Sequence, residues 1–154
     1  MKKPLVLLVL LAPLPGAAQK SLQPEFRVDV LASNASALHA SVGGNFPVGM
    51  YVRLGAAAGG GMRKIGEDWR ASGRVDATAR FLVDPFGEFK YGLYVGGGVS
   101  ALFDERTSGR ARAVVVAGFD GPLRFGRWMP GFEIGLGGGT RIGFTLRRAR
   151  AAAR

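Results

Sequence analysis

Apolar and polar residues alternate along most of this chain with a period of two. In the clearest stretch, Ala71 to Ala101, polar positions Arg74, Asp76, Thr78 and Arg80 separate apolar Val75, Ala77, Ala79 and Phe81. Successive side chains of a strand point to opposite faces, so the pattern predicts strands with one polar and one apolar face. The motif Asp84-Pro85-Phe86-Gly87 supplies a turn, because Pro fixes φ and Gly permits positive φ. The stretch therefore predicts one long β-hairpin.

The same alternation on either side of this hairpin predicts eight strands in all. The other strands are expected at residues 25–32, 37–44, 50–60, 110–119, 131–137 and 140–146. The tight turn near 137–140 leaves open that the last two are one bent strand. Turns or polar loops are expected at 33–36, 45–49, 62–69, 104–109 and 120–130. Glycine triplets begin at Gly59, Gly96 and Gly137, a spacing of about 40 residues that favours an up-and-down meander over a Greek key.

The first 18 residues have the form of a secretory signal peptide. A positive Met1-Lys2-Lys3 precedes a leucine-rich run, and small residues prepare a cleavage site after Ala18. A membrane anchor is the alternative, but Pro13 and Pro15 end the apolar run well before the about 20 residues that a spanning helix needs. We therefore expect a signal peptide at 1–18, a barrel domain at 19–146 and a basic tail at 147–154.

Composition narrows the fold class. The chain has no Cys, 25 Gly and 47% hydrophobic residues. A secreted chain without Cys has no disulfides, so a sizeable core or a closed sheet must stabilise it. Alternating apolar residues in a Gly-rich secreted chain are typical of membrane barrels, whereas a soluble barrel needs a polar outer face. The sequence predicts an all-β fold, an eight-stranded up-and-down antiparallel transmembrane β-barrel.

The leader, the eight alternating strands and the Gly-rich, aromatic pattern resemble the small outer-membrane β-barrels of Gram-negative bacteria, the OmpA/OmpX-like group. The segment from Gly139 to Phe144 is similar to the terminal strand that the barrel assembly machinery reads in such proteins. The tail from Arg147 to Arg154 departs from the family, whose members often end at an aromatic residue. The resemblance implies a monomer in the outer membrane that contacts outer-membrane lipids, including lipopolysaccharide, and has a structural or surface-interaction role.

The polar faces predict the contents of the lumen. An eight-stranded barrel is just filled by side chains, and charges inside it must be paired or wet. We therefore expect no open pore and a polar network that includes Arg27, Asp29, Arg74, Asp76, Arg80 and Glu133. The same polar faces also hold Arg53, Lys90, Arg112 and Arg141, so bases outnumber acids there, which leaves an anion site as the alternative.

The apolar faces separate two interpretations of the barrel. A membrane barrel turns to the lipid a set of residues that includes Val75, Ala77, Ala79, Phe81, Val95, Val115 and Phe119. A soluble periplasmic or secreted barrel that binds a small apolar ligand would turn the same residues inward.

Catalytic chemistry has one candidate pair. His39 and Ser41 share a strand face, and a His-x-Ser pair occurs in the family's lipid A deacylases, which carry a Ser/His/Glu triad on their outer surface. A nucleophile needs a base within reach and a third group that orients the base, and no acid is clearly placed beside this pair. We expect no enzyme, with a lipid A-modifying hydrolase as the third hypothesis. A single His and no Cys give no metal-ligand spacing, and no cofactor is expected.

Basic and aromatic residues gather near the expected strand ends. Two basic groups could pair with lipid phosphates or form solvated edges: Arg63, Lys64, Arg70, Arg106 and Arg110 at one rim, and Arg124, Arg127, Arg147, Arg148, Arg150 and Arg154 at the other. Girdle candidates are Tyr51, Trp69, Phe86, Phe89, Phe125 and Trp128. A net charge of +10 would suit nucleic acid, but the leader removes the chain from the cytoplasm and no phosphate-binding loop is present.

Overall fold

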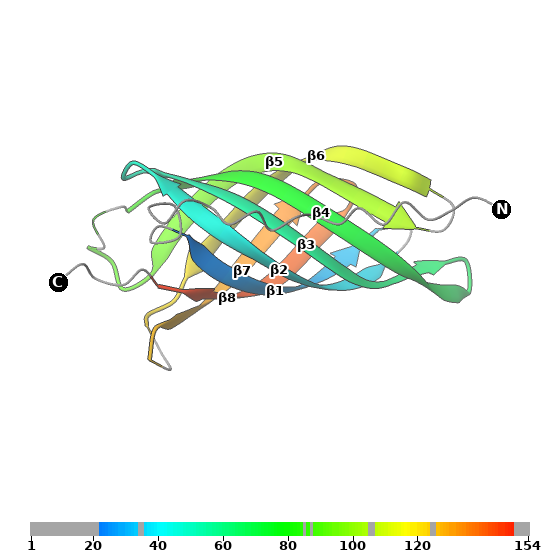
Figure 1. Ribbon diagram of the computed structural model, residues 1–154, viewed down its shortest axis with the longest axis horizontal. Coiled ribbons are helices and arrows are strands. Elements are labelled where there is room, and N and C mark those ends of the chain that lie inside the picture. Colours follow the sequence, from blue (N-terminus) through cyan, green and yellow to red (C-terminus); the bar gives the residue numbers. More distant parts are fainter. Residues whose placement is uncertain are drawn as a thin grey trace.

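The computed structural model describes residues 22–33, 36–84, 86, 88–104, 107–123 and 126–149. These residues form one closed barrel of eight antiparallel strands, each paired with its neighbours in sequence (Figure 1). The last strand pairs with the first and closes the sheet. The predicted eight-stranded up-and-down antiparallel barrel is thereby confirmed. The expected signal peptide lies outside the described residues.

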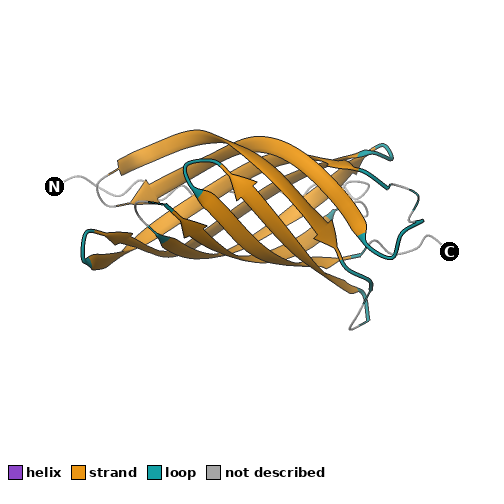
Figure 2. Cartoon of the chain, turned by 180° about the vertical axis from the view of Figure 1, so that it is seen from behind, coloured by secondary structure: helices purple, strands orange, loops and turns teal. Residues whose placement is uncertain are grey.

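The strands cross the barrel obliquely, and the view from behind shows strands joined by loops (Figure 2). Their bounds are β1 Gln23–Ala32, β2 Ala37–Val48, β3 Val52–Ile65, β4 Asp68–Leu82, β5 Gly92–Asp104, β6 Thr107–Asp120, β7 Trp128–Leu136 and β8 Thr140–Arg148. β7 and β8 are separate paired strands, and Gly138 and Gly139 between them adopt φ of 80° and 150°. Among the described residues, no helix has the length and apolar character that crossing a membrane would require.

Several connections are shorter than the sequence indicates. The expected loop at 62–69 is mostly paired strand, because β3 and β4 remain in register as far as Ile65 and Asp68. Gly66 turns the chain there with φ of 65°. The expected turn at 45–49 is likewise taken up largely by β2, which continues through Val48. A polar side chain does not end a strand as long as the backbone of the neighbouring strand is available for hydrogen bonding. The paired strands therefore extend beyond the residues that alternate between apolar and polar.

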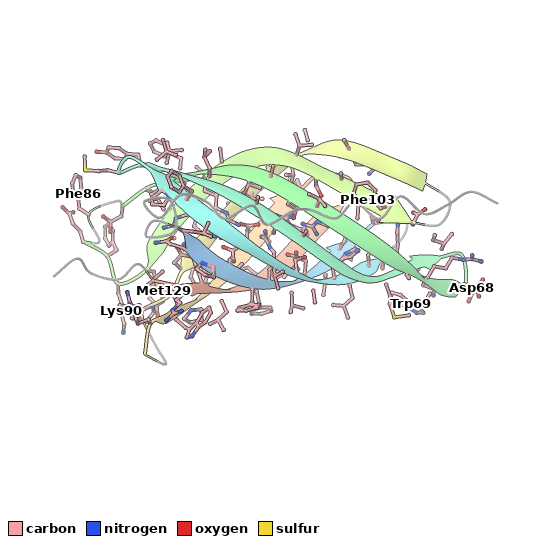
Figure 3. The ribbon with its side chains drawn as sticks, in the orientation of Figure 1. Asp68, Trp69, Phe86, Lys90, Phe103 and Met129 are labelled. Atoms are coloured by element: carbon pink, nitrogen blue, oxygen red, sulfur yellow. The ribbon has the colours of Figure 1, made fainter. Side chains whose placement is uncertain are left out.

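Side chains alternate between the inside and the outside of the wall. In β1, Glu25, Arg27 and Asp29 are buried, whereas Phe26 and Val28 are each about half exposed at 49%. The usual distribution of a soluble protein is thus reversed, with charge inside and apolar side chains outside. We call the end at which β1 begins and β8 ends the proximal end, and the other the distal end. Phe86, Lys90 and Met129 lie at the proximal end and Trp69 at the distal end (Figure 3).

Candidate functional site

The lumen is the most highly charged part of the described structure. Its buried charged side chains are six arginines and five carboxylates: Arg27, Arg53, Arg74, Arg80, Arg141, Arg147, Glu25, Asp29, Asp76, Asp120 and Glu133. They come from β1, β3, β4, β6, β7 and β8, because the strand period of two turns alternate residues of each strand inward. Figure 3 shows nitrogen and oxygen atoms inside the wall and carbon-rich side chains that project outside it.

Glu133 is the central acceptor of this network. Its side chain is fully buried and its carboxylate receives hydrogen bonds from arginines on three other strands. Arg80 Nε donates to Oε2 at 3.1 Å, Arg141 Nη2 donates to Oε1 at 2.5 Å, and Arg27 Nη2 also donates to Oε1. The hydroxyl of Tyr94 donates to Oε2 at 3.1 Å. One carboxylate on β7 therefore ties together β1, β4, β5 and β8 across the lumen.

A second group of pairs lies on the distal side of Glu133. Arg74 Nε and Nη2 donate to the two carboxylate oxygens of Asp76 at 2.9 and 2.5 Å. Arg141 Nη1 donates to Asp76 at 3.2 Å, and Arg27 Nε donates to Asp29 at 3.0 Å. Such charge-assisted bonds are the strong ones in proteins, and their planar geometry holds the guanidinium groups in fixed orientations.

A third group lies toward the proximal end and includes a residue expected in the tail. Arg147 belongs to β8, is fully buried and donates to Glu25 at 3.3 Å and to Asp120 at 2.6 Å. Arg53 also donates to Asp120, at 3.0 Å, and Arg80 donates to Glu25 at 3.1 Å. Because Arg80 reaches both Glu25 and Glu133, the three groups form one continuous network.

Inward glycines make room for these large side chains. A Cβ added to Gly118 would lie 2.6 Å from the Tyr94 hydroxyl, and one added to Gly143 would overlap Asp29 Oδ1. At Gly135 a Cβ would approach Arg141 Nε at 3.4 Å. At these positions glycine leaves space for the long side chains of the narrow lumen, and at Gly118 and Gly135 it also avoids the carbonyl oxygens of Phe132 and Val115, at 2.5 and 3.1 Å.

All six residues of the predicted lumen network lie inside the barrel and are joined by ion pairs. Arg53 and Arg141, two further residues of the polar faces, belong to the same network, whereas Arg112 is half-buried and Lys90 is exposed. The structure adds Glu25, Asp120 and Arg147, together with Tyr94 and Asn45 as hydrogen-bonding partners. The strand period marks Arg53 and Arg141 as inward, whereas Glu25, Asp120 and Arg147 fall at expected strand ends, where alternation gives no signal. The network has one more base than acid, and each of the eleven groups has an opposite charge beside it, which favours the ion-pair interpretation over an anion site.

The seven residues expected to face lipid all lie on the outer wall and are exposed: Val75, Ala77, Ala79, Phe81, Val95, Val115 and Phe119. Across the described outward positions of the eight strands, charged side chains occur at two places, Lys64 and Arg148. Each is the cross-strand partner of a tryptophan, Lys64 of Trp69 at the distal end and Arg148 of Trp128 at the proximal end. The chain has two tryptophans, so both of them flank an outward cation.

The candidate catalytic pair lies on the inner wall. His39 is fully buried and its Nε2 is 2.9 Å from the hydroxyl of Ser72 on β4, while Ser41 is buried one pleat away on the same strand. A Ser/His/Glu triad of the lipid A deacylase kind would require this pair to face outward. The structure instead gives His39 a partner other than Ser41, inside the charged lumen.

The rim candidates divide between the two ends. At the distal end, Arg63 forms an ion pair with Asp104, with 3.0 Å between Nη1 and Oδ2. Arg70 forms another with Asp68, with 3.6 Å between Nη2 and Oδ2. At the proximal end, the ring of Tyr51 stacks on Phe81. The other candidate aromatics of this end are Phe86, Phe89 and Trp128. Arg106, Arg124, Arg150, Arg154 and Phe125 lie outside the described residues, as does the side chain of Arg110.

The fold and the lumen define a closed eight-stranded β-barrel with an apolar outer wall and a continuous internal ion-pair network. A comparison of the chain with models of known protein families finds no match, and a comparison with curated proteins finds none either. The OmpA/OmpX-like resemblance is therefore an expectation that rests on architecture.

Proposed function

We propose that this protein is a small outer-membrane β-barrel with a structural or surface-interaction role and no open pore. The observation that carries the proposal is the outer wall. Its described charges, Lys64 and Arg148, lie near opposite ends, and the side chains between them are apolar or small. Such a band flanked by aromatic and basic residues is the surface that a bilayer solvates, and closure of the sheet satisfies the backbone hydrogen bonds of the wall.

The interior supports the absence of a pore. Ion pairs cross the lumen from β1 and β4 to β7 and from β8 to β4, so side chains occupy its middle. A cavity beside Arg80 and Asn45 has a volume of about 10 Å³, the size of a single water. A hydrated ion that followed the barrel axis would have to break several buried ion pairs.

The same distribution of side chains argues against a soluble barrel that carries an apolar ligand. Such a barrel needs an apolar lumen, and here eleven of the described side chains of the inner wall are buried and charged. Its outer face should be polar, whereas the exposed outer residues include Phe81, Val95 and Val115. The lipid A hydrolase hypothesis is also less favoured, because a buried Ser41 cannot meet a lipid that surrounds the barrel.

Fractionation tests the proposal. The chain is expressed with its leader in a Gram-negative host, and inner and outer membranes are separated and run on SDS gels with and without boiling. Recovery in the outer membrane, with a band whose migration changes on boiling, is the expected result. Recovery as a soluble periplasmic protein would overturn the proposal and return attention to a ligand in the lumen.

A further inference from the structure

An aromatic groove runs along the outer wall near the proximal end of β6, β7 and β8. Its volume is about 250 Å³, and its walls are the rings of Tyr91, Phe119, Phe132 and Phe144. Phe119 pairs with Phe132 across β6 and β7, and Phe132 pairs with Phe144 across β7 and β8. The ring centroids of these two pairs are 6.1 and 5.4 Å apart. The three phenylalanines thus form one row that crosses three strands.

Between the aromatic rings, the groove is lined by glycine and proline residues, whose side chains are absent or compact. The β6–β7 ladder ends at Asp120 and Gly131, after which Gly121 N donates to the carbonyl oxygen of Pro130 at 2.6 Å. Gly121 and Gly131 have no side chains, and the rings of Pro122 and Pro130 are compact. A narrow apolar groove between aromatic rings matches the shape of an extended, flexible hydrocarbon chain.

A cation lies on the same strip of wall, farther toward the proximal rim. The outward residues of β8 end with Phe144, Leu146 and Arg148, and the four-residue step from the groove to Arg148 spans about 13 Å along the strand. Trp128 is the cross-strand partner of Arg148, and the centroid of its ring lies 5.7 Å from the ring centroid of Phe26. Among the described outward side chains of β5 to β8, Arg148 is the one that carries charge, and no carboxylate faces outward beside it.

We propose that this strip binds one anionic phospholipid, with an acyl chain in the aromatic groove and its phosphate on the guanidinium of Arg148. The order of groups along the strip is the order along such a lipid, apolar tail and then anionic head. A guanidinium binds phosphate oxygens through two parallel hydrogen bonds, and an indole ring such as that of Trp128 prefers the level between tail and head. The inference rests on the proposed function, because both require the outer wall to face lipid.

Quenching of Trp128 by brominated lipids tests the site. The full chain is purified from membranes as Trp69→Phe, so that Trp128 is the sole tryptophan, and a boiling-sensitive band on SDS gels verifies the fold. It is reconstituted in phosphatidylcholine vesicles that contain increasing amounts of dibrominated phosphatidylglycerol or dibrominated phosphatidylcholine. Half-maximal quenching is expected at an about fivefold lower mole fraction of the anionic lipid, the ratio that one basic residue near an anionic surface supplies.

Two substitutions separate the site from a general attraction to charge. Arg148→Gln should remove the preference while leaving quenching by both lipids, whereas Lys64→Gln, the matched outward cation beside the other tryptophan, should leave it intact. Phe132→Ala should lower the quenching by the anionic lipid, because it removes one wall of the groove. A preference that persists in Arg148→Gln would overturn the assignment of the phosphate to Arg148.

The remaining outcomes distinguish this inference from the proposed function. Equal quenching by the two lipids in the parent protein would overturn the lipid site alone. A folded barrel whose Trp128 is quenched by neither lipid would show that the strip is covered by something else, and a dimer on cross-linking would identify a second copy as the cover. Failure of the folded chain to enter vesicles at all would count against the proposed membrane location itself.

Discussion

The hydroxyl of Tyr94 meets the carboxylate of Glu133 across the lumen at 3.1 Å, and the guanidinium of Arg80 lies over the Tyr94 ring, with Cζ 5.3 Å from its centroid. The two residues belong to β5 and β7, which are not neighbours in the barrel. Side chains thus connect strands that the backbone ladder leaves apart, and the barrel is braced through its centre as well as around its wall.

The first prediction concerns Glu133 as central acceptor. Glu133→Gln removes the charge that Arg27, Arg80 and Arg141 share, and breaking buried ion pairs by removal of one partner costs about 3–5 kcal/mol. We expect the free energy of unfolding in detergent micelles, measured by urea titration with the SDS-gel band shift, to fall by that amount. Glu67→Gln in the exposed β3–β4 turn is the control and should change it by less than about 0.5 kcal/mol. Equal stability of both variants would contradict the role of the network.

The alternation predicted the direction of most side chains and a count of eight strands, because a period of two is a local property. It left open whether the last two strands are one bent strand, which the paired ladder of β7 and β8 decides. Arg27 and Asp29 could be assigned to the lumen from this alternation. The sequence could not show that Arg27 reaches Glu133, 106 residues away. That contact depends on the closure of β1 onto β8 and on the register of the paired strands of the barrel. Nor could alternation show the cross-strand pairing of Arg148 with Trp128.

Arg147 shows why strand ends were harder to predict. A run of basic residues after Leu146 is typical of a tail, yet β8 continues through Arg148 because β1 and β7 still offer paired backbone there.

The second prediction uses the difference between Arg147, which faces the lumen, and Arg148, which faces outward. Arg147→Met should lower the free energy of unfolding by about 3 kcal/mol, since Asp120 and Glu25 lose a buried partner. The neighbouring Arg148→Met, which faces outward, should change it by less than about 0.5 kcal/mol. Both are measured in zwitterionic micelles without anionic lipid.

A double-mutant cycle with Asp120→Asn refines that test. If Arg147 and Asp120 act as a pair, the double variant should be more stable than the sum of the two single losses implies, with a coupling energy of about 1–3 kcal/mol. Additive losses would show that Arg147 contributes through packing and not through this ion pair.

The third prediction concerns inward glycines. Gly118→Ala places a methyl group 2.5 Å from the carbonyl oxygen of Phe132 and 2.6 Å from the Tyr94 hydroxyl, so the β6–β7 backbone must shift and the ring must move away from Glu133, at a cost of about 1–3 kcal/mol. Gly60→Ala is the matched control on the outer wall, where the nearest atom to an added Cβ, the carbonyl oxygen of Ser72, lies at 3.7 Å. Urea unfolding should separate the two variants. Equal losses would mean that neither the Phe132 carbonyl nor the Tyr94 ring limits the space at Gly118.

The fourth prediction addresses catalysis. Because Ser41 is buried beside the ion-pair network and His39 contacts Ser72, we expect Ser41→Ala to leave the lipid A of an expressing strain unchanged in acyl-chain number, as judged by mass spectrometry. The comparison requires strains that express parent, variant or no protein at equal levels. Loss of an acyl chain with the parent and its return with Ser41→Ala would establish the hydrolase that the inner-wall placement argues against.

The fifth prediction distinguishes lipid from water outside the wall. Val115 is 65% exposed on β6, and Val48 is 46% exposed at the proximal end of β2. An arginine on the lipid face costs about 2–4 kcal/mol at the bilayer midplane and about 0–1 near an interface. Val115→Arg should therefore destabilise the barrel in phospholipid vesicles far more than Val48→Arg does. If water surrounded the wall, both arginines would be solvated at once, and the two variants would unfold at the same urea concentration as the parent.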